Sequence, residues 1–166
     1  MKKLLVVLVL VLGAGTSMAQ SKVAHVNSQV ILDTLPSRKA AIIKLQEFEK
    51  NGVAELQEME EDFNLAVAKY QKEQPNMTPI LIKIEEEKLM KKQQALQERE
   101  SSLNAEMQAY SQELNAPILE KVQKAVEIVS ERKKLNYVID ESVTLYFKGG
   151  MDITDEVIVE LLNLDK

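Results

Sequence analysis

The chain has 166 residues, a formal net charge of −5, 4% aromatic residues and no cysteine. An acidic chain is a poor nucleic-acid binder, because neutralising phosphates needs clustered Lys and Arg. The lack of Cys excludes disulfides, thiolate nucleophiles and sulfur metal ligands. Glu, Lys, Gln, Leu and Ala dominate, which is typical of long helices.

Residues 1–19 have the three parts of a secretory signal peptide: a basic start, an apolar run at 4–12, and small residues at Ser17 and Ala19. The alternative is a membrane anchor, but the run has about half the ~18 apolar residues that a spanning helix needs. We expect cleavage after Ala19, export, and no stable membrane insertion afterwards. Residues 20–166 then make up a single domain.

The mature chain opens with a predicted strand at 22–27, where apolar residues dominate. Ser28 is expected to cap a short helix through Leu35, which Pro36 ends. Ser37 can cap the helix that follows.

Residues 38–114 are predicted to form an antiparallel helical hairpin with its turn at 75–79, where two prolines fall close together. Apolar or small residues recur in heptad steps on both helices, as in a coiled-coil seam. About 35 residues per helix make an arm on the order of 50 Å long. The seam of the first helix is Leu45, Phe48, Gly52, Leu56, Met59, Phe63, Ala66 and Tyr70. The second helix has Ile82, Leu89, Leu96, Leu103 and Tyr110 at its heptad positions. Its companion positions, which complete the seam four residues after each of these, are Glu86, Gln93, Glu100, Met107 and Leu114.

Pro117 predicts a kink or helix restart, followed by an apolar stripe from 118 to 129. Residues 135–139 and 143–147 read as two strands of a hairpin. Thr154 is the expected N-cap of a final helix, whose apolar positions include Val157, Ile158, Leu161 and Leu162.

The predicted fold is therefore α+β and mainly α, with a helical arm that projects from a small β body. The body is split between 20–37 and 115–166, and it is too small to enclose a good core alone. We expect it to oligomerise so that strands from several chains share one core. The residues expected there are Val23, Val26, Val138, Ile139, Leu145 and Phe147.

No catalytic, cofactor-binding or metal-binding residues are predicted, and no enzymatic activity is expected. His25 is the only histidine, and we interpret it as a packed or hydrogen-bonded side chain. The acidic runs 58–62 and 85–87 lack the ligand spacing and glycine of a calcium loop. They are interpreted as solvated helix faces.

Both ends of the mature chain resemble the Skp/OmpH family of periplasmic chaperones. The matching segments are 22–32 with Pro36, and then 137–140, 145–147 and 152–157. The resemblance implies a homotrimer, in which a β body built from three chains carries three arms around a cavity. It also implies an ATP-independent function, holding unfolded outer-membrane β-barrel proteins in the periplasm without a cofactor.

One departure from that family is charge. Familiar members have positive arms, whereas residues 38–110 carry 11 Lys or Arg against 14 Asp or Glu. Only the tip is locally basic, at Lys69, Lys72 and Lys83.

The arm side chains expected to contact clients are apolar and not all needed by the seam. They are the tip group Met77, Ile80 and Leu81 and the seam-flanking Val53, Val67 and Met90. For each of them the alternative is packing inside the hairpin. The alternative function is a coiled-coil adaptor of the cell envelope that binds one folded partner.

Overall fold

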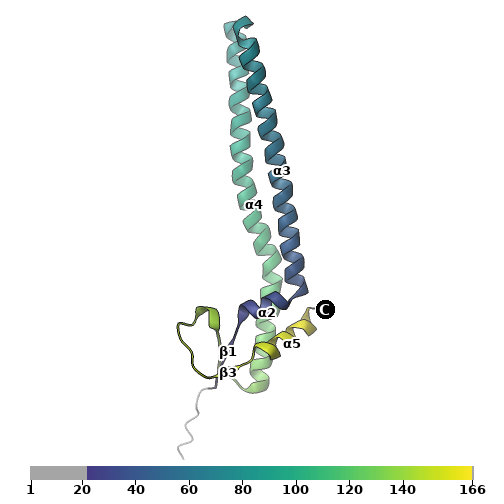
Figure 1. Ribbon diagram of the computed structural model, residues 1–166, viewed down its shortest axis with the longest axis vertical. Coiled ribbons are helices and arrows are strands. Elements are labelled where there is room, and N and C mark those ends of the chain that lie inside the picture. The colour runs from purple at the N-terminus through teal and green to yellow at the C-terminus, as the bar shows by residue number, and fades with distance from the viewer. Residues whose placement is uncertain (1–21, 166) are drawn as a thin grey trace, which may run out of the picture.

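A long two-helix arm rises from a small body, as the sequence predicts (Figure 1). The computed structural model describes residues 22–165, so the predicted signal peptide at 1–19 lies outside the described residues. The arm consists of α3 (Pro36–Glu73) and α4 (Pro79–Lys133). Within the described range, no helix is both long and apolar enough to cross a membrane.

The turn at the tip of the arm agrees closely with the prediction. A single 3₁₀ turn, η1 (Gln74–Asn76), connects the two helices. Thr78 caps α4 as expected, because its hydroxyl accepts the Leu81 N–H at 3.4 Å. Pro79 then occupies the first turn, where its missing N–H leaves no helical hydrogen bond unmade.

The body contains a three-stranded parallel sheet in the order β2-β1-β3. Its strands are β1 (Val23–Val26), β2 (Tyr137–Asp140) and β3 (Met151–Asp152). The helices α2, α3 and α4 all lie between β1 and β2 in sequence, which gives the chain the long crossover that a parallel pair requires.

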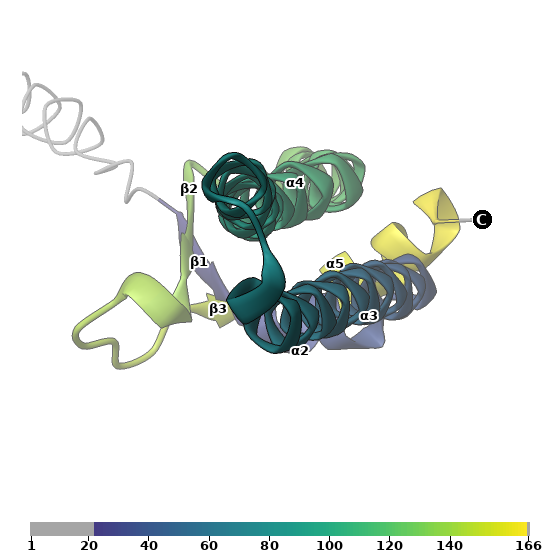
Figure 2. The same ribbon diagram turned by 90° about the horizontal axis from the view of Figure 1, so that it is seen from above.

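The predicted hairpin of 135–139 with 143–147 is wrong, because the second segment is not a strand. Asp140 redirects the chain: its carboxylate accepts the Ser142 N–H at 3.0 Å, and its carbonyl accepts the Thr144 hydroxyl at 2.9 Å. Such local bonds compete with a strand ladder. The resulting loop swings out on the side of the sheet away from α4 and α5 (Figure 2).

Three predicted helix caps are also wrong, among them Ser37, which lies inside α3 while Leu35 holds the cap position. Asn27, and not Ser28, caps α2 (Ser28–Thr34), since its side-chain oxygen accepts the Val30 N–H at 3.0 Å. Thr154 is the first residue of α5 (Thr154–Leu164) and not its cap. Its buried hydroxyl instead accepts the Asn27 N–H at 3.0 Å, which ties α5 to the start of α2.

Pro117 does not restart a helix, since α4 runs through it without a break. A proline inside a helix removes one backbone hydrogen bond. Nearby, the Asn115 amide donates to the Ser111 carbonyl at 2.7 Å, a side-chain bond that adds support to this stretch of the helix. The apolar stripe beyond Pro117 packs into the body, as predicted.

One core joins the sheet to α2, α4 and α5. The inward face of β1 packs on the helices. Within residues 22–165 no α-helix covers the other face, which the loop after β2 flanks (Figure 2). The buried cluster is Ala24, Val26, Ile31, Leu35, Ala41, Ile118, Ala125, Val129, Ile153, Val157 and Leu161.

The helix α3 begins at Pro36, which the sequence predicted only as the end of the preceding helix. Its N-cap residue, Leu35, offers no side-chain hydrogen bond. Asp165, just past the end of α5, supplies a carboxylate instead: it accepts the Ser37 N–H at 3.2 Å and pairs with Lys121 at 2.9 Å. An anion at a helix N-terminus is favourable, so this contact fixes the root of the arm on the body.

The Asp165 contact gives the fold a pH dependence. Burial, the largest influence, raises the pKa of Asp165, but the hydrogen bonds from Lys121 and Ser37 outweigh it and hold the pKa below its usual value. Because the pKa of Asp165 is lower in the folded chain than in the unfolded chain, its contribution to the free energy of unfolding is complete above the unfolded pKa of about 3.9. This contribution is lost as the pH falls through the folded pKa.

We therefore expect Asp165→Asn to lower the free energy of unfolding at pH 7 by about 1.5–3 kcal/mol, the range for a hydrogen bond to a charged group. This difference from the wild type should shrink as the pH falls through the folded pKa. Urea denaturation at fixed chain concentration measures both effects. Glu120→Gln, at an exposed acid on α4, is the control. An equal loss in the control would contradict the assigned role.

Candidate functional site

The arm is zipped by the predicted seam. All eight seam positions of α3 are buried or half-buried, and so are the five heptad positions of α4 together with Met107 and Leu114. The two helices approach closely at Gly52, because a Cβ there would lie 2.2 Å from Leu103 Cδ1. Near the root, the rings of Phe48 and Tyr110 lie 5.2 Å apart.

The polar companion positions of α4 are displaced from the prediction. Glu86, Gln93 and Glu100 are exposed, whereas Glu85 and Arg99 are half-buried at the seam. At Glu85 and Arg99 the half-buried residue therefore lies three positions after the heptad residue instead of the predicted four, whereas Lys92, three positions after Leu89, is exposed. Long polar side chains can cover a seam with their stems while their heads stay in water.

Polar contacts link the two helices of the outer arm. Arg99 pairs with Glu55 on α3 at 2.9 Å and with Glu106 on its own helix at 3.3 Å. The hydrogen bond to Glu55 is the main cause that raises the pKa of Arg99. Exposed ion pairs of this kind stabilise a fold only weakly, because solvent screens them. The outer arm is therefore held by a thin apolar seam and weak ion pairs.

Nearer the tip, the Tyr70 hydroxyl donates to the Glu86 carboxylate at 2.9 Å. Burial, followed by this hydrogen bond, raises the pKa of Tyr70. Lys92 on α4 also forms an ion pair with Asp62 on α3. These contacts set the register of the two helices without adding apolar burial.

The six predicted client-contact residues occupy different environments. Ile80 and Met90 are 76% and 62% exposed, and Val53 and Leu81 are also exposed. Val67 and Met77 are half-buried. The seam therefore leaves at least four of these apolar side chains open to contact, and it does not gather all six in one place.

Two grooves contain part of this set. Val53 lines an open groove of about 400 Å³ along α3. Met77 and Leu81 share a second groove of about 260 Å³ between α3 and α4 near the tip. Val67, Ile80 and Met90 line neither groove.

Other exposed apolar side chains on the arm were not predicted. They are Ile42, Ile43, Leu65 and Ile84, of which Leu65 is 71% exposed. All four lie outside the heptad series, so a search for every large apolar residue off the seam finds them in the sequence.

The predicted body residues divide between the two faces of the sheet. Val26 and Val138 pack toward the helices of their own chain. Val23 and Ile139 are exposed. The uncovered face also presents His25, which the strand register places beside Ile139.

The remaining two body residues, Leu145 and Phe147, lie in the loop after β2. Leu145 is fully exposed. The ring of Phe147 lies 5.0 Å from that of His25. His25 is hydrogen-bonded, as predicted: its Nδ1 lies 2.7 Å from Glu141 Oε1.

The fold defines the class of protein: a coiled-coil protein whose projecting arm exposes apolar side chains that its seam does not bury. Comparison with known proteins gives its family. Residues 22–161 match the family described as "Outer membrane protein (OmpH-like)". The chain belongs to this family, as the resemblance predicted, and its function is that of a chaperone.

Curated relatives match over most of their length. The Chaperone protein Skp of Pectobacterium atrosepticum is 31% identical over 160 residues, covering 92% of this chain and 93% of the relative. The Chaperone protein Skp of Photorhabdus laumondii subsp. laumondii is 28% identical over 143 residues, covering 86% and 87%.

A solved structure shares the fold. The crystal structure of a putative outer membrane chaperone (OmpH-like) from Caulobacter crescentus CB15 matches with a TM-score of 0.73. It is 18% identical, and the match covers 86% of this chain and 85% of that one. At this identity the likeness bears on the fold alone.

Proposed function

We propose that this protein is an ATP-independent periplasmic holdase, which keeps unfolded outer-membrane β-barrel proteins from aggregating in a cavity between helical arms. The observation that carries the proposal is the set of large apolar side chains left exposed on an arm whose seam is already filled. Isolated exposed apolar residues need no explanation, but repeated ones along a projecting hairpin are typical of a binding surface.

The chaperone holds and releases its client without nucleotide hydrolysis because it binds the client through many weak contacts. An unfolded barrel protein presents alternating apolar residues and unpaired strand edges, which aggregate with one another. Several arms around one client raise the effective concentration of each contact. Because each contact breaks easily, folding of the client into the membrane outcompetes the cage and drives release.

The proposal includes a homotrimer. Its support is the sheet face that carries Val23, Tyr137 and Ile139, all of them exposed in the single chain. The expectation that the body cannot enclose a good core alone is wrong, because eleven apolar residues between 22 and 165 form a buried cluster within the single chain. Export to the periplasm rests on the predicted signal peptide at 1–19 and on the family.

The client surface is tested with the triple variant Val53→Ser, Ile80→Ser and Met90→Ser. Burial of each side chain against a client stabilises the complex by about 1 kcal/mol. The variant should therefore need at least tenfold more protein to suppress aggregation of denatured barrel proteins. Its stability should change little, because all three side chains are exposed.

The matched control places Leu at the same three positions, which keeps the surface apolar. It should hold clients as the wild type does. The assay uses several unrelated denatured barrel proteins, because an adaptor would bind only one folded partner. Full holding by the serine variant would show that these side chains do not form the client surface.

A further inference from the structure

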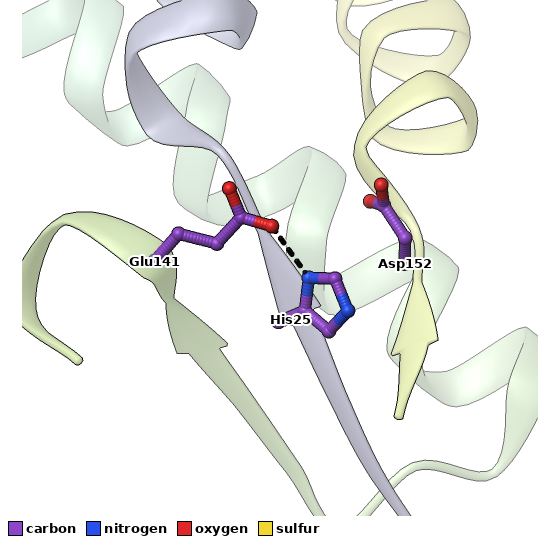
Figure 3. A group of neighbouring side chains, drawn as sticks. All are labelled: His25, Glu141 and Asp152. Carbon is purple, nitrogen blue, oxygen red and sulfur yellow. Dashed lines mark hydrogen bonds and ion pairs between the residues drawn. The ribbon is translucent and has the colours of Figure 1, made fainter. Parts of the chain in front are cut away.

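Three ligand-type side chains converge on the uncovered face of the sheet. His25 lies on the central strand, Glu141 follows β2, and Asp152 lies on β3. One ligand atom from each lies within 4.8 Å of the other two. Figure 3 shows His25 between the two acids, which approach it from opposite sides. The parallel register creates this arrangement, since it places Asp152 directly beside His25.

Each carboxylate is oriented by a further hydrogen bond. Glu141 Oε2 accepts the Asn27 amide at 3.0 Å, while Oε1 faces His25. Asp152 Oδ1 accepts both the N–H and the hydroxyl of Thr154, at 2.9 and 2.6 Å. Among residues 22–165, Asp152 Oδ2 accepts no hydrogen bond. Outer partners of this kind orient the ligands of metal sites.

The surroundings hold the imidazole and leave the cluster accessible. Phe147 packs on the ring of His25, and Gly150 passes its edge with a φ of 102°. A Cβ at position 150 would lie 3.3 Å from His25 Cδ2, so a larger residue would crowd the ring. Asp152 is exposed in the single chain, so an ion can reach the cluster before subunits assemble.

Charge also favours a cation here. Two carboxylates and one imidazole form a donor set of one nitrogen and two oxygens. Zn²⁺ accepts His nitrogen and carboxylate oxygen together, whereas Ca²⁺ and Mg²⁺ prefer oxygen alone.

We propose that His25, Glu141 and Asp152 form a binding site for a divalent transition-metal ion of the Zn²⁺ class. With bonds of about 2.0–2.2 Å, the donors of a tetrahedral zinc site lie about 3.3 Å apart. The 2.7 Å contact between His25 and Glu141 therefore opens slightly on binding, and Asp152 moves inward. Water completes the coordination in the single chain, and a group from a neighbouring subunit can take that position where the proposed assembly covers this face.

The bound ion would join segments that are distant in sequence. His25 and Glu141 are 116 residues apart, and the ion adds a third link to β3. Because the unfolded chain cannot present these ligands together, binding stabilises the folded body. The site therefore strengthens the sheet on which the arm depends.

Zn²⁺ titration of the EDTA-stripped mature chain, by calorimetry and by thermal unfolding, tests the site. We expect one ion per chain and a rise in the melting temperature. Glu141→Gln and Asp152→Asn keep the shape of each side chain and should each weaken binding at least tenfold. His25→Phe removes the nitrogen ligand while keeping a ring against Phe147, and it should abolish the thermal shift.

The matched control is Glu58→Gln, which removes one exposed acid from the arm and should leave zinc binding unchanged. Equal binding by the wild type, Glu141→Gln and Asp152→Asn would show that zinc associates non-specifically with the acidic surface. That result would overturn the proposal, as would the absence of binding by the wild type up to about 1 mM zinc. If His25→Phe fails to fold, the two amide variants still decide the question.

Discussion

Deleting two heptads from each helix of the arm, residues 56–69 and 86–99, is expected to abolish most of the holding activity and leave the body folded. The deletion shortens the arm by about 21 Å and preserves the heptad register on both helices. Glu100 then takes the place of Glu86 opposite Tyr70, so the tip keeps its closing contact. The loss follows because the shortened arms enclose a smaller cavity, and because the deletion removes Leu65 and Met90, two of the most exposed apolar side chains of the arm.

The readouts for this deletion are aggregation of denatured barrel proteins, circular dichroism and oligomer mass. The outer arm adds no contact to the buried core of the body, so the mass should stay that of the wild-type assembly. Undiminished suppression of aggregation by the shortened protein would contradict the proposed role of the arm.

The second large effect is expected from Ile139→Lys on the uncovered sheet face. Ile139 is 43% exposed in the single chain, where a surface substitution typically changes stability by less than about 0.5 kcal/mol. If other copies cover this face, the same lysine becomes a buried unpaired charge, which is destabilising by about 3–5 kcal/mol. We therefore expect the assembly to dissociate into monomers while the secondary structure is retained.

Val159→Lys is the matched control, because it places the same charge at an exposed apolar position on α5. Its oligomer mass should equal that of the wild type. Size-exclusion chromatography with light scattering measures both variants. An intact assembly with Ile139→Lys would show that subunits do not meet through this face.

The arm could be predicted almost residue by residue because a heptad seam is a local, repeated signal. Steps of three and four leave few ways to pair two helices, and the seam from Leu45 to Tyr70 follows the prediction. The polar companions of α4 could not be placed in the same way. Glu85 is half-buried while the exposed Glu86 accepts the cross-helix hydrogen bond from Tyr70, and a heptad pattern does not distinguish these two places.

The body was harder to predict because its contacts link distant parts of the chain. An apolar run such as 143–147 suits a strand by composition, but the hydrogen bonds of Asp140 turn the chain before a ladder can form. The cluster of His25, Glu141 and Asp152 had no sequence signal, since its members have no ligand spacing. Only the parallel register brings them together.

The most direct measurement is the solution mass and shape of the mature protein, with and without one denatured barrel protein. If subunits contact one another through the sheet face and their arms enclose a client, the protein is an elongated particle of three chains. This particle gains the mass of a single client on binding. A compact monomer that takes up no client would contradict the account.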